Sequence, residues 1–75
     1  MKFETRRQLK DKTWHASGLL NVLKSDFDYM KKDVDNRHLD KLSESIQDVS
    51  ITLRKLMLIV GELEYILKLD KTEGP

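Results

Sequence analysis

The stretch LDKLSESIQDVSITLRKLMLIVGELEYILKL, residues 39–69, decides the fold of this chain. Its apolar residues recur at alternating intervals of three and four positions, in the series Leu39, Leu42, Ile46, Val49, Leu53, Leu56, Val60, Leu63 and Leu67. A mean spacing of about 3.5 keeps one apolar stripe turned toward a partner helix along its whole length. The stretch therefore predicts a long helix over residues 37–69 that packs against another helix.

The residues upstream repeat this spacing. The series is Leu9, Thr13, Ala16, Leu20, Leu23, Phe27, Met30 and Val34, in which only Thr13 is polar. It predicts a first helix over residues 4–33. Residues 13–18, TWHASG, are a place at which this helix could break, and its continuity there stays open. Together the two series are the predicted stripes of the fold.

A short connection over residues 34–37 makes the two helices antiparallel neighbours. Asp35 or Asn36 is expected to accept a hydrogen bond from the first free amides of the second helix, as an N-cap. Residues 70–75 are polar and end in Gly-Pro, which predicts a frayed tail.

Pairing the stripes around this turn places Leu20 opposite Leu53, near the middle of the hairpin. The same register places Lys10 beside Glu64, a pair expected to contribute only a few tenths of a kcal/mol. The sequence therefore predicts a core centred on the two leucines.

The composition sets the remaining limits. The chain has 75 residues, no cysteine, a single proline at position 75 and a net charge of +1. We expect one small all-α domain over residues 1–75, with no disulfide and no thiolate metal site. No apolar run reaches the roughly 18 residues of a membrane span, and the N-terminus lacks the apolar segment of a secretory signal. These features favour a cytoplasmic protein.

A lone two-helix hairpin buries its stripes on one side only, and 39% apolar residues is a thin supply for such a core. The sequence therefore predicts association, either as a homodimeric four-helix bundle or with the helices of another protein.

A second group of apolar residues lies away from the predicted stripes. On the second helix these residues are Ile51, Leu58, Gly61, Tyr65 and Leu69, and on the first they are Trp14, Val22 and Tyr29. An apolar strip that a hairpin cannot bury predicts a protein-binding surface, although it could also be a flank of a homo-oligomer core. A glycine inside a helix costs about 1 kcal/mol relative to alanine, which suits a close approach at Gly61.

Catalytic and metal-binding patterns are missing from the sequence. His15 and His38 lie at opposite ends of the first helix, and neither has a second ligand one turn away. There is no glycine-rich phosphate loop and no nucleophile elbow. We therefore expect no enzyme activity, no metal and no cofactor.

The charge distribution leaves one alternative open. Residues 1–32 carry eight basic and four acidic side chains, whereas residues 33–75 carry six basic and nine acidic ones. The basic residues near the N-terminus that could bind RNA or DNA are Arg6, Arg7, Lys10 and Lys12. The pI of about 8.0 is lower than that of a typical nucleic-acid-binding domain. The favoured function is a small non-catalytic adaptor, regulator or inhibitor that binds protein, and a dimeric nucleic-acid-binding regulator is the alternative.

Overall fold

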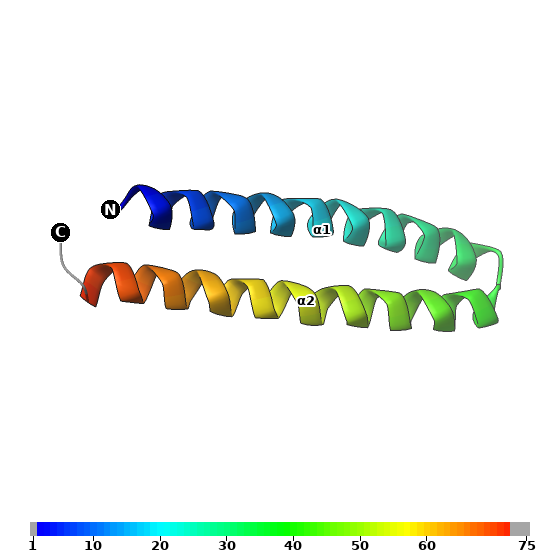
Figure 1. Cartoon of the computed structure of the whole chain (residues 1–75). Helices are drawn as coiled ribbons and strands as arrows, with labels where there is room; N and C mark the ends of the chain where they lie inside the picture. Colours follow the sequence, from blue (N-terminus) through cyan, green and yellow to red (C-terminus); the bar gives the residue numbers. More distant parts are fainter. Residues whose placement is uncertain (1, 73–75) are drawn as a thin grey trace.

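The computed structural model describes residues 2–72, which form two antiparallel helices joined by a short turn (Figure 1). Helix α1 comprises Phe3–Asp35 and helix α2 comprises Leu39–Thr72. No strand occurs in this part of the chain, so the all-helical prediction is confirmed. Helix α2 continues to Thr72, so the first residues of the expected tail are helical. Residues 73–75 of that tail lie outside the described residues.

Helix α1 is continuous through residues 13–18, which answers the question that the sequence left open. Thr13 fits into the helix because its hydroxyl donates a hydrogen bond to the Leu9 carbonyl, at 2.6 Å. A threonine that bonds to the carbonyl one turn earlier stays compatible with helical backbone. No proline interrupts either helix, because the only proline is residue 75.

The turn is a helix C-cap of the Schellman type. The amide of His38 donates to the carbonyl of Asp33 at 2.8 Å, and the amide of Arg37 donates to the carbonyl of Val34 at 3.2 Å. Arg37 has a φ of 58°, the left-handed conformation that this position requires and that glycine adopts at the lowest cost. The turn therefore places a strained arginine between the helices.

The predicted N-cap is wrong, because Asp35 and Asn36 close α1 instead of starting α2. Asn36 is the C-cap of α1, and its amide donates to the Lys32 carbonyl at 2.9 Å. Helix α2 begins at Leu39, and the first carbonyl used in it is that of His38, which accepts from the Leu42 amide at 3.0 Å. Asp35 and Asn36 thus belong to the end of α1, and α2 begins at Leu39, two positions after the predicted start at residue 37.

The core of the hairpin is thin. Its most buried apolar side chains are Leu23, Val49 and Ile59, which are 6–7% exposed. Thr52 is also buried, and its hydroxyl donates to the Asp48 carbonyl at 3.1 Å. Within residues 2–72 no large side chain is fully buried. Two helices alone therefore give each core residue cover on one side only.

The contact surface between the helices is rotated relative to the predicted stripes. The buried and half-buried residues of α1 are Thr5, Leu9, Lys12, Ala16, Leu19, Leu23, Asp26, Met30 and Asp33. Those of α2 are Leu42, Ser45, Val49, Ser50, Thr52, Leu56, Ile59, Leu63, Ile66 and Asp70. Every second member of each predicted stripe is missing from these sets.

The prediction that Leu20 and Leu53 form the middle of the core is therefore wrong. Their side chains are 56% and 46% exposed. A single partner helix covers only a narrow strip, and the rotation brings Leu19 and Ile59 into that strip instead. The apolar surface of each helix is wider than one neighbour can bury.

The register along the hairpin agrees with the prediction to within about one residue. Lys12 forms an ion pair with Glu62, and the Lys2 amide lies 3.3 Å from a carboxylate oxygen of Asp70. The ion pair expected between Lys10 and Glu64 is thus replaced by one that lies two residues nearer the turn. The rotation explains the change, because it turns Lys12 toward α2.

Candidate protein-interaction surfaces

Half of the two predicted stripes lies on the surface and forms what we call the long face. Its residues are Leu20, Phe27 and Val34 of α1 and Leu39, Ile46, Leu53, Val60 and Leu67 of α2, all of them exposed. Soluble proteins seldom leave a continuous apolar strip of this length in water unless it is used. The long face is therefore the first candidate interaction surface.

The stripes of the two helices emerge on the same side of the hairpin. In α1, Leu20 directly follows the contact residue Leu19, and in α2, Val60 directly follows Ile59. One step along a helix rotates the side chain by about 100°, and the rotation has the same sense in both helices when each is viewed from its own N-terminus. Because the helices are antiparallel, equal rotations turn both stripes toward one face.

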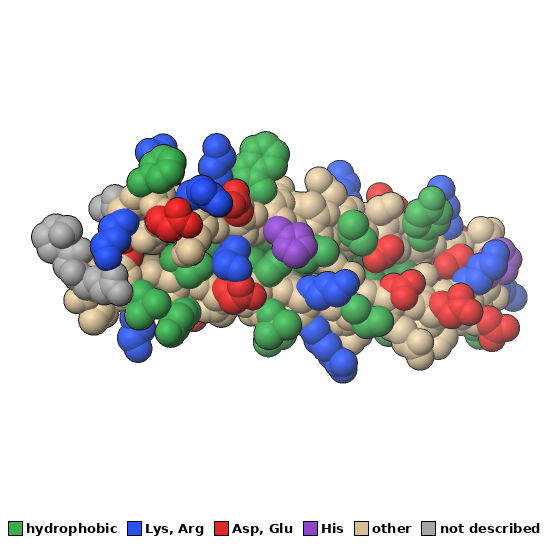
Figure 2. Space-filling view, viewed as in Figure 1, with side chains coloured by type: hydrophobic (Ala, Val, Ile, Leu, Met, Phe, Trp, Pro, Cys, Tyr) green, Lys and Arg blue, Asp and Glu red, His purple; other side chains and the backbone are tan. Residues whose placement is uncertain are grey.

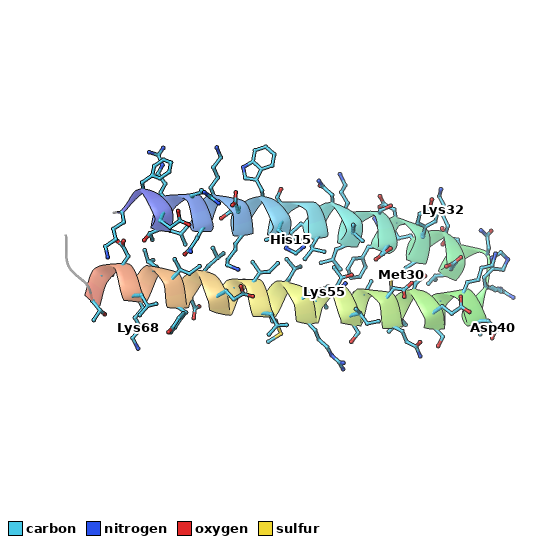
Figure 3. All side chains as sticks on the ribbon, viewed as in Figure 1. His15, Met30, Lys32, Asp40, Lys55 and Lys68 are labelled. Atoms are coloured by element: carbon cyan, nitrogen blue, oxygen red, sulfur yellow. The ribbon has the colours of Figure 1, made fainter. Side chains whose placement is uncertain are left out.

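A shallow hollow near the turn supports this arrangement. It is lined by Phe27, Met30 and Val34 from α1 and by Leu42 from α2, together with Lys31 and Asp35. Met30 lies between the two helices (Figure 3). Side chains of both helices thus meet at the long face as one surface.

The other side of the hairpin carries most of the charged side chains between apolar ones. A residue that directly precedes a contact residue is turned away from the long face, as are His15 before Ala16 and Lys55 before Leu56. His15 lies on the face seen in Figure 3, and Figure 2, drawn from the same side, shows lysine, arginine and acidic side chains there with hydrophobic side chains between them. The hairpin therefore has one apolar side, the long face, and one side that carries charged side chains together with exposed apolar ones such as Leu58 and Tyr65.

The predicted partner-binding residues of α2 are all exposed. Leu58 and Tyr65 are 68% and 63% exposed, and they line a shallow hollow with Gly61 and with Gln8 and Asp11 of α1. We call this the Gly61 hollow. Ile51 and Leu69 are exposed but do not line it.

Gly61 itself lies in open space. A side chain added there would meet nothing within 4 Å among residues 2–72, so none of these residues requires a glycine at this position. Met57, which also lines the hollow and is exposed, was missed by the sequence reasoning. Its spacing of four residues from Gly61 was the signal that could have identified it.

On α1 the predicted residues Trp14, Val22 and Tyr29 are exposed as well. The ammonium group of Lys32 lies 5.7 Å from the centre of the Tyr29 ring, a cation–π contact at the surface. None of the three aromatic or apolar residues lines the Gly61 hollow. These α1 residues are therefore not part of the Gly61 hollow.

Three of the four basic residues proposed for nucleic acid form one cluster. Arg6, Arg7 and Lys10 are exposed and line a small hollow with Phe3 at the start of α1. Lys12 lies outside this cluster because it pairs with Glu62. Arg7 is also 4.0 Å from Glu4, an acidic neighbour on the same helix.

Metal ligands do not gather anywhere in residues 2–72: no three His, Asp or Glu side chains there are placed to hold an ion. Over the same residues, neither helix has a segment that is both long and apolar enough to cross a membrane. No protein-family model, curated protein or solved structure matched the chain.

Proposed function

We propose that this chain is a non-catalytic protein–protein interaction module, an adaptor, regulator or inhibitor that works through its apolar helical faces. The observation that supports this most strongly is the exposure of eight large apolar residues along the long face. A function in binding explains why the helices carry more apolar surface than one hairpin can bury.

The two apolar surfaces suit different tasks. Covering the long face completes the half-buried core, so we propose that it mediates self-association into a homodimeric four-helix bundle. Leu58 and Tyr65 directly precede the contact residues Ile59 and Ile66, so they are turned away from the long face. These two side chains of the Gly61 hollow therefore stay accessible in such a bundle, although Met57 at its edge borders the long face, and we propose that the hollow binds a different protein.

Substitutions in the Gly61 hollow test this proposal. Leu58→Glu places a charge in the hollow and Gly61→Leu fills it, so each is expected to abolish recovery of the partner from the native host. The matched control is Gly18→Leu, because Gly18 is also an exposed helical glycine with nothing within 4 Å. The partner is a protein recovered with the wild type and the control but with neither variant.

Size and helicity are measured for the same variants by light scattering and circular dichroism. The proposal expects both to stay unchanged. If Leu58→Glu or Gly61→Leu instead dissociates the homo-oligomer, the hollow is part of its core and the proposed division between the two surfaces is wrong.

The cluster of Arg6, Arg7 and Lys10 supports nucleic-acid binding as a second candidate function. Three phosphate contacts predict that log K falls with log salt with a slope of about −2 to −3. Fluorescence anisotropy with labelled RNA and DNA over a salt series measures this slope. Reversing Arg6 and Arg7 to Glu should abolish binding, whereas Lys55→Glu on α2 should retain it. Weak binding that both variants reduce equally contradicts a specific site.

A further inference from the structure

The size of the long face matches a dimer interface. The hairpin is 56 Å long and 15 Å wide, so covering one face removes roughly 800 Å² from water on each copy, about what each partner buries in a stable complex. Both helices contribute a stripe to it, so the face can pack against the same face of a second copy through a two-fold axis. A second copy of this chain is therefore a suitable occupant.

The two rims of the long face carry different charges. We define the rims as two series of residues that recur every seven positions. The α1 series includes Lys10, which directly follows the contact residue Leu9, and the α2 series includes Glu64, which directly follows the contact residue Leu63. The rim of α1 consists of Lys10, Ser17, Lys24 and Lys31. The rim of α2 consists of Ser43, Ser50, Met57, Glu64 and Lys71. The charged residues of the α1 rim are thus all basic. The α2 rim carries one acid, Glu64, at the level of Lys10, and one base, Lys71, near its end.

Two-fold symmetry allows two orientations of the hairpins. When the turns lie at opposite ends, α1 packs beside α1 of the partner, and Lys10 meets Lys24 or Lys31 of the partner. When the turns lie at the same end, α1 packs beside α2 of the partner, and the two rims meet at equal height. Like charges placed directly opposite each other are unfavourable, so the rims favour the second orientation.

The register within the hairpin identifies the pair that forms in this orientation. Lys12 pairs with Glu62 inside one chain, so Lys10 and Glu64 are also at equal height. Both are exposed, at opposite rims of the same face. A two-fold axis parallel to the helices brings Lys10 of each copy to Glu64 of the other. Lys24 and Lys31 then face Ser50 and Ser43 of the partner, without a like charge.

From this geometry we infer that two copies of the chain associate through the long face with both turns at the same end, and that reciprocal Lys10–Glu64 pairs between the copies select this orientation. The inference rests on the proposed self-association and adds the surface that is buried, the orientation of the two copies and the ion pairs that select this orientation. Specificity for the chain's own long face follows from the pairing of Lys10 on one rim with Glu64 on the other.

A spin label at the turn tests the orientation. The chain has no cysteine, so Asn36→Cys gives one label per copy. With turns at the same end, double electron–electron resonance should give a distance below about 30 Å, because neighbouring helices are 8–10 Å apart. With turns at opposite ends, the labels are separated by nearly the 56 Å length of the hairpin. Thr72→Cys, at the other end, should repeat the short distance if Asn36→Cys disturbs the turn.

Charge reversal tests the pair. Glu64→Lys is expected to raise the dimer dissociation constant about three- to tenfold at low salt, and combining it with Lys10→Glu should restore the original value. Glu44→Lys, an exposed change of the same charge away from the rims, should have no effect. Glu44→Lys changes the net charge by the same amount as Glu64→Lys, so an unchanged affinity in this control distinguishes pairing from a general change in net charge.

The outcomes separate the two levels of inference. A monomer at high concentration contradicts both the proposed self-association and this arrangement. A dimer with a long label distance leaves self-association intact and overturns the orientation. A short distance with no response to charge reversal overturns the Lys10–Glu64 pair.

Discussion

Truncating Leu53 to alanine is the most direct test of the exposed long face. Leu53 is 46% exposed in the hairpin, and burying a whole leucine side chain is worth about 2 kcal/mol, so association can add about 1 kcal/mol per copy. Both copies lose this contribution in the variant. We therefore expect the free energy of association to weaken by about 2 kcal/mol, so that the dimer dissociation constant rises roughly 30-fold.

Leu23→Ala is the matched control, because Leu23 is only 7% exposed within the hairpin. Its truncation should cost about 2–4 kcal/mol of hairpin stability through lost burial and a cavity. Sedimentation equilibrium measures the dissociation constant under native conditions, and urea unfolding at several protein concentrations measures stability. The reasoning is refuted if Leu53→Ala leaves the dissociation constant unchanged, or if both variants behave alike at every concentration.

Three other predictions concern local features. Arg37→Gly should raise the free energy of unfolding by about 1 kcal/mol, because glycine adopts the left-handed conformation without strain; a loss in urea unfolding at equal protein concentration would contradict it. Gly18→Ala and Gly61→Ala should each raise stability by about 1 kcal/mol, since both sites are open helical positions. A smaller gain in either thermal unfolding curve would indicate a contact with another molecule there. A double-mutant cycle on Lys12 and Glu62 should give a coupling under about 1 kcal/mol that decreases with salt.

The two helices and their antiparallel order could be predicted because nothing in the sequence interrupts the regular spacing. The rotation of the helices could not. A spacing of 3.5 indicates that a stripe exists. Leu19 and Leu20 are both apolar but lie about 100° apart around the helix, and only the packed pair decides which one faces inward. The same ambiguity applies to Ile59 and Val60 on the other helix.

The candidate surface was predictable only where it lies on one helix. Leu58, Gly61 and Tyr65 follow one another at three and four residues, so their common face could be derived from the sequence alone. The contribution of Gln8 to the same hollow depends on the register between helices, which no local pattern contains. At the turn, arginine in the left-handed conformation at position 37 ran against the preference for glycine, so the end of α1 was placed too early.

The free ends of the two helices lie side by side, with the Lys2 amide 3.3 Å from Asp70 and the turn at the far end (Figure 1). Tension applied to these ends pulls across the helix pair and not along it. The contacts then break one after another from the open end toward the turn, so each step works against only a few side chains. The hairpin alone therefore resists only a small force in this direction. A molecule bound along the long face spans many of these contacts at once, so more of them must break together and the force needed to open the hairpin rises.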